Sequence, residues 1–510
     1  MLGKIINIID NKVVLKLSID PKTTQNLLNL YVLIKDNQNS FIGEIVSIKE
    51  DEASITLIGE YINNELNFGI IQKPALSAKV DLINPSYIEQ LLNYKEGRSF
   101  KIATSPFYNG VPVKAKINSL FGSHLAVFGS TGSGKSCSYA KIIQNILKEE
   151  NLSNKMNLVI FDAYGEYANA FEYLNQTPNR GFKMFTTQIN GNKELISIPP
   201  WFLDADDYAL LLQVTKKYQI SIIEKALRNV SLFKKNETDV ITYKNSIIAN
   251  ALLDILLSGR PAAQIRDLFL SALSKFHTKD LNLESTIYQP GYSRTLRQCL
   301  LIDDNNKINA IEQIAEFLQK FLIEDVYSSM PDGSFPYTLE DFSNGLEFAL
   351  IDEGIWKSDR IFDDANILKV RLNSLLNSDT KEYFQTEQFK NIHNPNIAIS
   401  KQEYINYLFS VNGTQKAQIV NFNISYVDDR FAKIIVKIFS KLFFNFAKEL
   451  DNRGSIPFNL ILEEAHRYVQ HDSDIELIGY NIFERIAKEG RKYGVLINLI
   501  SQRPCELSET

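Results

Sequence analysis

Cysteine and histidine are scarce in this sequence, with three cysteines and five histidines among 510 residues. The cysteines, Cys137, Cys299 and Cys505, show no close pairing, so neither a disulfide framework nor a cysteine metal site is predicted. The histidines are scattered as well. This usage suits the reducing cytosol, and we predict a cytoplasmic protein.

Long apolar runs are also missing. No run approaches the roughly 18–20 residues that span a bilayer, and the first residues lack the apolar core and cleavage site of a signal peptide. The most apolar segment, 433–448, is interrupted by Lys437 and Lys441. We predict that it is a packed core helix and that the protein has no membrane partner. The alternative is a helix for a membrane surface or a partner.

Strong charge of either sign is absent too. The net charge of −5 argues against a surface coated with nucleic acid, but it does not exclude a local basic channel. Hydrophobic residues make up 45% of the chain, which is enough for a large core. The length allows about two to four domains, and the sequence contains no internal repeat.

Four parts can be distinguished along the chain. Short strands rich in Ile and Val, with polar turns, predict a small barrel, followed by a proline-containing connector within 71–117. Strands then alternate with helices on both sides of a long helical stretch that contains a loop at 328–337. The fold class is therefore α/β, a RecA-like core with a mostly parallel sheet. The predicted parts are the N-terminal β-barrel over 1–95, the first part of the core over 96–199, the helical insert over 200–410 and the second part of the core over 411–510.

The segment GSTGSGKS, residues 129–136, matches the phosphate-binding loop motif in every spacing. Glycines let successive backbone N–H groups face phosphates, and the following helix adds its positive end. Lys135 reaches the β- and γ-phosphates, and the Ser136 hydroxyl ligates Mg²⁺. We therefore predict that ATP and Mg²⁺ bind here. The predicted binding residues are Gly129, Ser130, Thr131, Gly132, Ser133, Gly134, Lys135, Ser136 and Cys137.

A hydrolase of this kind needs carboxylates at a strand end close to the loop. Two stretches compete, LVIFDAYGEY with Asp162 and Glu166, and LILEEAHRYV with Glu463 and Glu464. The second has adjacent acids, so the tasks of holding the metal and polarising water can be divided between neighbours. Its distance along the chain from Lys135 is explained if the helical insert bulges out of the sheet. A capping or loop-fixing role for Asp162 and Glu166 stays open.

The segments FGSTGSGKS, DAYGEY, LILEEAHRYV, ERIAKEGRKYGV and ISQRP occur here in the order found in HerA-type ATPases. The chain resembles this family, which belongs to the HerA/FtsK branch of RecA-like motors, over the barrel and the whole core. The resemblance implies a homo-hexameric ring that uses ATP to move double-stranded DNA. It also implies a nuclease or NAD-consuming effector bound through the barrel, in some bacteria for antiviral defence.

The resemblance also assigns roles to individual residues. Glu464 matches the catalytic glutamate, and Glu463 matches a metal-binding position where aspartate is usual, which predicts slower hydrolysis. Gln502 resembles a polar sensor of the γ-phosphate, with an ordinary capping glutamine as the alternative. In the predicted amphipathic helix over 478–494, Arg485 or Arg491 reaches a neighbouring subunit's γ-phosphate, or else both belong to a solvated charged face.

Two further departures from the family pattern concern the ring. An arginine that often precedes the first core strand is replaced by Ser123 and His124. The chain also stops soon after Gln502, so it is either a truncated form or a subunit whose ring is completed differently.

These features are compatible with three functions to different degrees. A DNA-translocating ring ATPase is predicted first. A nucleotide-dependent ring scaffold that assembles and regulates an effector enzyme is the alternative, favoured by Glu463 and by the missing arginine. A small-molecule kinase is poorly supported, because the water-directing glutamate and the sensor-like Gln502 indicate hydrolysis.

Overall fold

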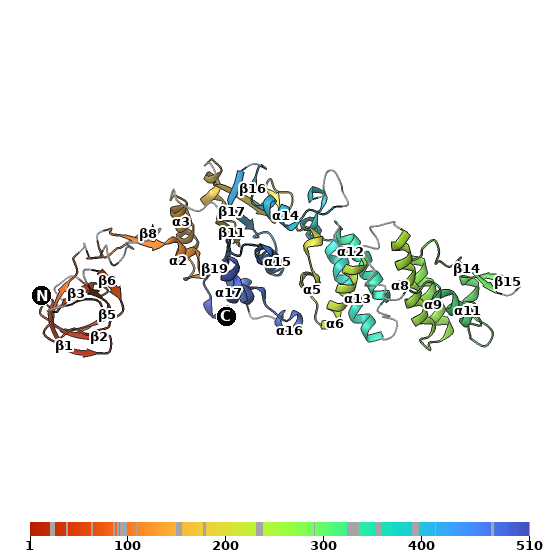
Figure 1. Cartoon of the computed structure of the whole chain (residues 1–510), viewed down its shortest axis with the longest axis horizontal. Helices are drawn as coiled ribbons and strands as arrows, with labels where there is room; N and C mark the ends of the chain where they lie inside the picture. Colours follow the sequence, from red (N-terminus) through yellow and green to blue (C-terminus); the bar gives the residue numbers. More distant parts are fainter. Residues whose placement is uncertain are drawn as a thin grey trace. The chain divides into compact units, whose positions relative to one another are not determined.

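The computed structural model divides into two compact units, each described by itself, and Figure 1 traces the chain through them. The first unit comprises Met1–Ser123 and Ser136–Leu152, and the second comprises His124–Lys135 and Ser153–Thr510. The residues that the structure describes are 1–20, 26–36, 39–62, 65–84, 87–88, 91, 99–108, 110–148, 156–176, 180–230, 238–289, 291–323, 336–352, 359–389, 397–413, 415–470 and 474–508.

The first unit begins with a closed β-barrel, as predicted. Six antiparallel strands follow one another in the order β2-β1-β7-β3-β4-β5, and β5 pairs back onto β2 to close the ring, while β6 extends the sheet beyond β5. Alternate residues point inward and form an apolar core, as a barrel requires. The strands are β1 (Gly3–Ile9), β2 (Lys12–Leu17), β3 (Tyr31–Lys35), β4 (Ser40–Lys49), β5 (Glu52–Ile62), β6 (Glu65–Phe68) and β7 (Lys79–Leu82).

The predicted connector at 71–117 is wrong in part, because it contains β7. This strand lies between β1 and β3, and its Val80 is fully buried in the barrel core. Strand β7 has only four residues and lies among prolines, so its pattern was too short to detect. The rest of the stretch holds the hairpin β8 (Ser99–Thr104) and β9 (Pro112–Lys116) and the short helix α2 (Ile117–Phe121). The predicted boundary between residues 95 and 96 lies outside the described residues.

The core of the second unit is a sheet in the order β10-β19-β18-β11-β17-β12-β13. These strands are all parallel to one another, and only β16 is antiparallel, on β17, so the predicted mostly parallel sheet is confirmed. The strands are β10 (Leu125–Phe128), β11 (Asn157–Asp162), β12 (Gly181–Thr186), β13 (Glu194–Leu195), β16 (Ser410–Val411), β17 (Gln415–Asn423), β18 (Phe458–Glu463) and β19 (Val495–Ser501).

Helix α15 (Asp429–Glu449) is the central helix of this unit. The Asp428 carboxylate caps it by accepting the Phe431 N–H at 2.7 Å. Most of its residues are buried, and it packs against helices α5 and α17 and strand β19. The predicted core helix at 433–448 is therefore confirmed. Within the part of the chain that the structure describes, no helix is long and apolar enough to cross a membrane.

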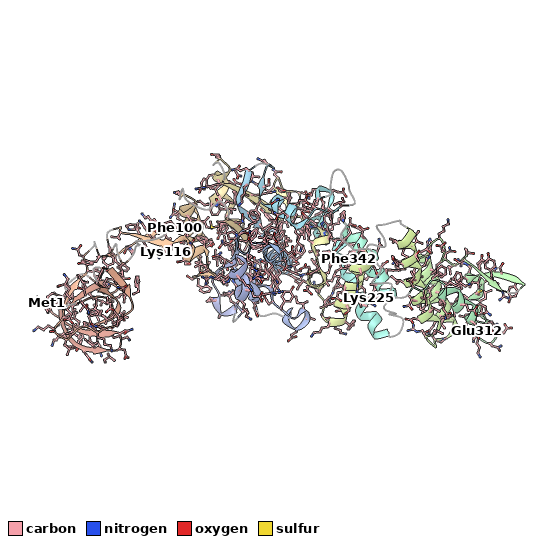
Figure 2. All side chains as sticks on the ribbon, in the orientation of Figure 1. Met1, Phe100, Lys116, Lys225, Glu312 and Phe342 are labelled. Carbon is pink, nitrogen blue, oxygen red and sulfur yellow. The ribbon has the colours of Figure 1, made fainter. Side chains whose placement is uncertain are left out.

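Helices dominate the stretch between β13 and β16, as the periodicity predicted. Helix α12 packs on α6 and α13, and Phe342 of α12, labelled in Figure 2, stacks on Tyr208 of α5 with ring centroids 3.8 Å apart. A second apolar cluster joins α8 to α11. The predicted loop at 328–337 lies, up to residue 335, outside the described residues. The helices are α5 (Ala205–Leu211), α6 (Lys217–Asn229), α8 (Thr238–Leu256), α9 (Ala262–Lys275), α10 (Leu296–Cys299), α11 (Ile311–Gln319), α12 (Leu339–Asp352), α13 (Asp359–Leu376) and α14 (Lys401–Leu408).

The hairpin of β14 (Thr286–Gln289) and β15 (Tyr292–Thr295) within this stretch was not predicted. The remaining helices of the second unit are α4 (Ala168–Phe171), α16 (Asp474–Ile478) and α17 (Ile482–Tyr493), and α3 (Lys135–Leu147) follows β10.

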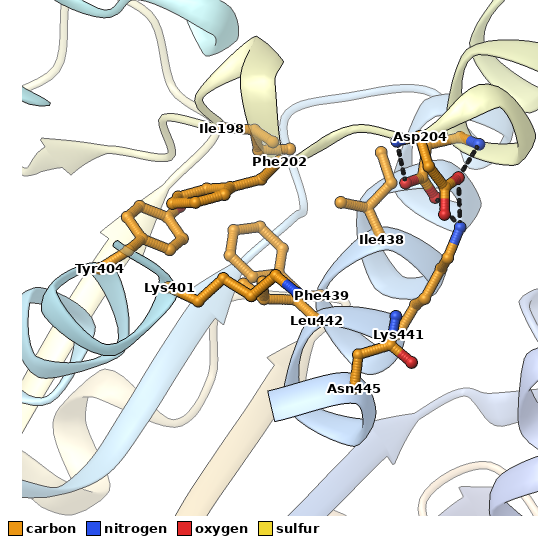
Figure 3. A pocket seen from close by; sticks show the side chains of 11 residues that line it. Ile198, Phe202, Asp204, Lys401, Tyr404, Ile438, Phe439, Lys441, Leu442 and Asn445 are labelled. Atoms are coloured by element: carbon orange, nitrogen blue, oxygen red, sulfur yellow. Dashed lines mark hydrogen bonds and ion pairs between the residues drawn. The ribbon is translucent and has the colours of Figure 1, made fainter. Parts of the chain in front are cut away.

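An ionic cluster around Lys441, in which Asp207 is buried and Asp204 is exposed, fixes the first helix of this stretch to α15. The Lys441 ammonium lies 2.5 Å from Asp204, 3.1 Å from Asp207 and 3.9 Å from Asp206. Asp204 also caps α5 by accepting two backbone N–H groups, and the Tyr480 hydroxyl donates to Asp206 at 3.0 Å. The cluster therefore connects α5, α15 and the chain just before α17. A cavity of about 140 Å³ lies beside it, between Phe202, Tyr404 and Phe439 (Figure 3).

The protonation of Asp207 makes this cluster sensitive to pH. Burial raises the pKa of Asp207 to about 7, although Lys441 opposes the shift. In the unfolded chain this carboxyl titrates near pH 4. Between these values the folded state binds more protons than the unfolded state, so this contribution to stability is lost as the pH rises through about 7.

We predict that the free energy of unfolding falls between pH 6 and pH 8 in the wild type, and that this fall is smaller in the Asp207→Asn variant. The difference between the two proteins should be about 1 kcal/mol. Urea unfolding at the two pH values, followed by tryptophan fluorescence, measures this difference. Trp201 lies just before the cluster in the chain. Asp267→Asn, at an exposed carboxylate, is the matched control and should leave the pH dependence as it is. Equal pH dependence in all three proteins would contradict the prediction.

Candidate active site

The loop after β10 has the conformation that its glycines permit. Gly132 and Gly134 adopt φ of +76° and +83°, which other residues rarely adopt. A Cβ atom on Gly129 would lie 2.5 Å from the Ser133 Oγ. The Lys135 ammonium donates to the Ser130 carbonyl at 3.1 Å, so it is held over the loop. The loop is thus a backbone cradle with one cation, which is the arrangement that binds phosphates.

Helix α3 begins directly at Lys135. Its first N–H groups have no partner within the helix and carry its positive end, which favours an anion at this point. Ser136 and Cys137 are the second and third residues of α3, and Cys137 is exposed. The sequence of strand, glycine loop and helix that the motif requires is therefore present.

The two adjacent glutamates lie at the end of β18. Glu463 is the last residue of the strand and is 1% exposed, and Glu464 is 7% exposed. Glu464 has φ 49° and ψ 50°, a left-handed conformation that is uncommon for a residue other than glycine. Backbone strain of this kind often accompanies functional positions. The strand therefore ends abruptly at Glu464, and a short 3₁₀ turn, Ala465–Arg467, follows.

The register of the sheet brings this strand end level with the glycine loop. Phe128 at the end of β10 pairs with Ser501 of β19, and Glu463 of β18 pairs with Ile500 of the same strand. Strands β10 and β18 therefore flank β19, and two strand spacings separate them by about 10 Å. Because all three strands are parallel, the loop and the glutamates lie at one edge of the sheet.

Gln502 connects the loop to this edge. It follows β19 directly, and its side-chain oxygen accepts a hydrogen bond from the Thr131 hydroxyl in the middle of the loop. Gln502 lies at the end of β19, the strand between β10 and β18, and this position explains the contact.

His466 was missed by the sequence analysis. Its Nδ1 atom lies 3.3 Å from the Glu464 carboxylate and 3.1 Å from the Ser501 hydroxyl, and the side chain is buried. The only signal in the sequence was its place two residues after Glu464. A single histidine next to an acidic pair is too common a pattern to indicate a role.

Asp162 and Glu166 have different surroundings from the glutamate pair. The Asp162 carboxylate accepts backbone N–H groups from its own loop, at 2.7–3.3 Å, and the Asn421 side-chain amide at 3.2 Å. Glu166 is exposed. Of the alternatives left open for this stretch, the geometry favours the loop-fixing role. The backbone donors to Asp162 are those of Tyr164, Gly165, Glu166 and Tyr167.

The two candidate arginines lie on α17, which is amphipathic as predicted, with Ile482, Phe483 and Ile486 buried. The predicted start at residue 478 is wrong, because Ile478 ends α16 and Gly479, with φ of +86°, separates the two helices. The Arg485 guanidinium lies over the rings of Phe444 and Tyr480, with 5.8 and 5.6 Å to the ring centroids. Arg491 is exposed in the last turn of the helix. The two arginines therefore differ in how free they are to contact another molecule.

His124, at the position where the family often has arginine, holds local structure. Its Nδ1 atom accepts the Ile497 N–H at 3.0 Å, so the proton of the neutral ring is on Nε2. Burial lowers the pKa of His124, and the nearby Arg491 charge lowers it further. A neutral histidine fixed to β19 does not supply the positive charge of the arginine that it replaces.

An open cleft of about 870 Å³ lies over the carboxyl ends of β11, β17, β18 and β19. Its size is sufficient for a nucleotide-sized ligand. Several basic side chains line it, among them Arg467, which pairs with Asp429, and Arg503, which pairs with Glu506. The lining residues include Tyr164, Arg430, Lys433, His466, Arg467, Gln502 and Arg503.

The carboxylates do not form a dense metal centre. In the described ranges, no group of three or more His, Cys, Asp or Glu side chains could hold a metal ion. Mg²⁺ does not need such a group, because it commonly takes one or two protein oxygens and completes its shell with phosphates and water. The buried carboxylate of Glu463 is a donor of the kind that Mg²⁺ prefers.

Two features together define a RecA-like P-loop protein. One is the glycine cradle with one lysine after the first strand, and the other is the buried glutamate pair at the end of a parallel strand of the same sheet. The chain belongs to the HerA helicase family, since the family profile "Helicase HerA, central domain" matches residues 101–443, about two thirds of its length. The DNA double-strand break repair helicase HerA of Pyrococcus furiosus is 22% identical over 492 residues, which are 93% of this chain and 70% of that protein.

Two solved structures show weaker likenesses. The plasmid coupling protein TrwB, in complex with a non-hydrolysable ATP analogue, is 11% identical, with a TM-score of 0.39 over 82% of this chain and 71% of that chain. VirB4 of Thermoanaerobacter pseudethanolicus is also 11% identical, with a TM-score of 0.39 over 81% of this chain and 79% of that chain.

We predict that Asp162→Ala lowers the free energy of unfolding of the second unit by about 2 kcal/mol or more, because buried N–H donors lose their acceptor. Thermal unfolding of the full chain measures this as a lower midpoint. Glu166→Ala, an exposed carboxylate of the same loop, is the control and should change stability by about 0.5 kcal/mol at most. If both variants unfold at the same temperature, Asp162 does not fix the loop.

Proposed function

We propose that the chain is an ATP-hydrolysing motor subunit of HerA type, which forms a hexamer and moves double-stranded DNA. The observation that carries the proposal is the shared register of β10, β19 and β18, which places the Lys135 loop and Glu464 at one edge of a parallel sheet. Membership of the HerA helicase family supports it. The effector, a nuclease or an NAD-consuming enzyme, binds the barrel, and the complex acts in DNA end processing or antiviral defence.

The chemistry assigned to the site is hydrolysis of the γ-phosphate of ATP. The glycine loop and Lys135 hold the phosphates, and Glu464 orients the attacking water and accepts its proton. Gln502, through its hydrogen bond to Thr131, responds to the presence of the γ-phosphate. Mg²⁺, when bound, neutralises phosphate charge, and Ser136 and Glu463 are the ligands that the motif and the family assign to it.

Of the two arginines, Arg491 is the better supported as the residue that reaches a neighbouring subunit's γ-phosphate. Its side chain is exposed at the end of α17. Arg485 lies over two aromatic rings, and moving it away would forfeit those cation–π contacts. An arginine of this kind contributes on the order of 10³–10⁵ in rate.

The second candidate function is a ring scaffold that binds nucleotide in order to assemble and to regulate an effector enzyme. Glu463 in place of aspartate and the neutral His124 in place of arginine favour it, because both weaken the groups that accelerate hydrolysis. A scaffold needs bound ATP but little turnover, and this difference separates the two functions in experiment.

We expect the wild type to hydrolyse ATP, and Glu464→Gln to bind ATP normally while single-turnover hydrolysis falls by about 10² or more, because the water loses its base. Lys135→Ala should lose ATP binding. Glu166→Gln, at the exposed carboxylate of the β11 loop, is the control for a lost charge. Wild-type turnover in Glu464→Gln would refute the assignment of Glu464.

The same two variants distinguish motor from scaffold in an assay of effector-dependent function. If the protein is a motor, effector-dependent function is lost in both Glu464→Gln and Lys135→Ala. If it is a scaffold, this function is retained in Glu464→Gln, where ATP stays bound, and is lost only in Lys135→Ala.

Duplex DNA should bind with an affinity that falls steeply with salt, because each phosphate contact releases counterions. We predict a loss of affinity of about tenfold or more between 50 and 200 mM salt. Fluorescence anisotropy with a labelled duplex of random sequence, in the presence of a non-hydrolysable ATP analogue, measures it. An affinity that does not change over this range would argue against a DNA-lined pore and in favour of the scaffold.

A further inference from the structure

His466 lies between the two sides of the candidate site. It belongs to the short turn after β18, and its Nδ1 atom faces two oxygen atoms, the Glu464 Oε2 at 3.3 Å and the Ser501 Oγ at 3.1 Å. The three residues are buried, with at most 9% of each exposed, although His466 also lines the open cleft. Polar atoms with so little exposure rely mainly on neighbouring side chains as partners.

A single proton on Nδ1 has two acceptors here. An ionised carboxylate only accepts hydrogen bonds, so the approach of Glu464 favours the form of the ring that carries hydrogen on Nδ1. His466 Nδ1 and Ser501 Oγ meet the geometry of a hydrogen bond. His466 Nδ1 and Glu464 do not, and the Glu464 Oε2 atom has no hydrogen-bond partner. The Ser501 hydroxyl already accepts the Arg503 N–H at 3.1 Å, so it does not depend on His466 as its only partner.

Ser501 is joined to the glycine loop through one peptide bond and one hydrogen bond. The next residue, Gln502, accepts the Thr131 hydroxyl of the loop. These contacts connect His466 to the glycine loop through Ser501 and Gln502. A phosphate in the loop competes for the Thr131 hydroxyl, and a backbone shift of Gln502 would carry Ser501 with it.

We propose that His466 is a positioning residue that orients the Glu464 carboxylate according to the state of the glycine loop. With Ser501 in the position described here, the Nδ1 proton is directed to the serine and Glu464 is held only loosely. When ATP displaces Gln502 and Ser501, the proton turns to Glu464 and fixes its carboxylate toward the water. This inference rests on the proposed function, since it assigns a role in hydrolysis.

A purely structural role is the alternative, in which His466 joins β18 to β19 and has no influence on Glu464 beyond stability. The two roles predict different effects on binding and turnover. A positioning residue affects the hydrolysis step, because misplacing a catalytic group by about 1 Å can cost 10²-fold in rate. A structural residue affects folding and nucleotide binding alike.

Two substitutions of His466 distinguish these roles. In His466→Leu an apolar side chain replaces the ring, and the donor is lost. In His466→Asn the side-chain amide places a donor close to the position of Nδ1. We expect His466→Leu to reduce single-turnover ATP hydrolysis at least tenfold, with affinity for a fluorescent ATP analogue within about threefold of the wild type. His466→Asn should recover most of the rate.

The double variant His466→Leu/Glu464→Gln tests whether the two residues act together. If His466 acts through Glu464, the leucine substitution lowers the residual rate of Glu464→Gln by less than about twofold, because coupled residues are not additive. Thermal unfolding of each variant reports whether it is folded, and His466→Asn provides the comparison where leucine is not tolerated.

The proposal is overturned if leucine and asparagine reduce hydrolysis equally, if analogue affinity falls in parallel with the rate, or if the double variant shows the full additional tenfold loss. These results differ from a failure of the proposed function. In that case the wild type itself would not hydrolyse ATP.

Discussion

The parallel alignment of β10, β19 and β18 is the constraint on which the rest of this site depends. In a parallel sheet every strand delivers its carboxyl end to the same edge, so the residues that follow the three strands meet whatever their separation in the chain. The pairing of Phe128 with Ser501 and of Glu463 with Ile500 sets their level along that edge. The helices between β13 and β16 lengthen the chain between Lys135 and Glu464 without separating the strands.

The acidic side chains around this sheet differ in their surroundings. Asp162 is occupied by the backbone of its own loop, and Asp204 and Asp207 are occupied by Lys441, at the junction of α5 with α15. Glu463 and Glu464 lie at the edge that also carries the glycine loop. Acidic residues that look alike in the sequence therefore have different surroundings in the folded chain.

The departures from the family pattern have consistent local consequences. His124 supports β19 by accepting a backbone N–H and is held neutral, so the positive charge of an arginine is lost at that point. Arg485 is engaged with aromatic rings on α15 and before α17, while Arg491 stays exposed. The glycine loop matches the family pattern fully, whereas Glu463 and His124 depart from it. This contrast is the reason for proposing both a slow motor and a scaffold.

The sequence by itself determined the barrel, the mostly parallel sheet, the helical insert and the glycine loop, because these depend on local periodicity and on spacing within a few residues. It also singled out Glu463 and Glu464 as an acidic strand end. Only the tertiary structure decided that β7 lies between β1 and β3 in the barrel, that Asp162 accepts the N–H groups of its own loop, and that His466 lies between Glu464 and Ser501. Strand β7 pairs with strands that are distant in the sequence, such as at Gly3 and Val80, and His466 meets Ser501 because β18 lies beside β19. Local patterns cannot select one among the many ways to pair such strands. The N–H groups that Asp162 accepts come from its own loop, in a conformation that no sequence periodicity predicts.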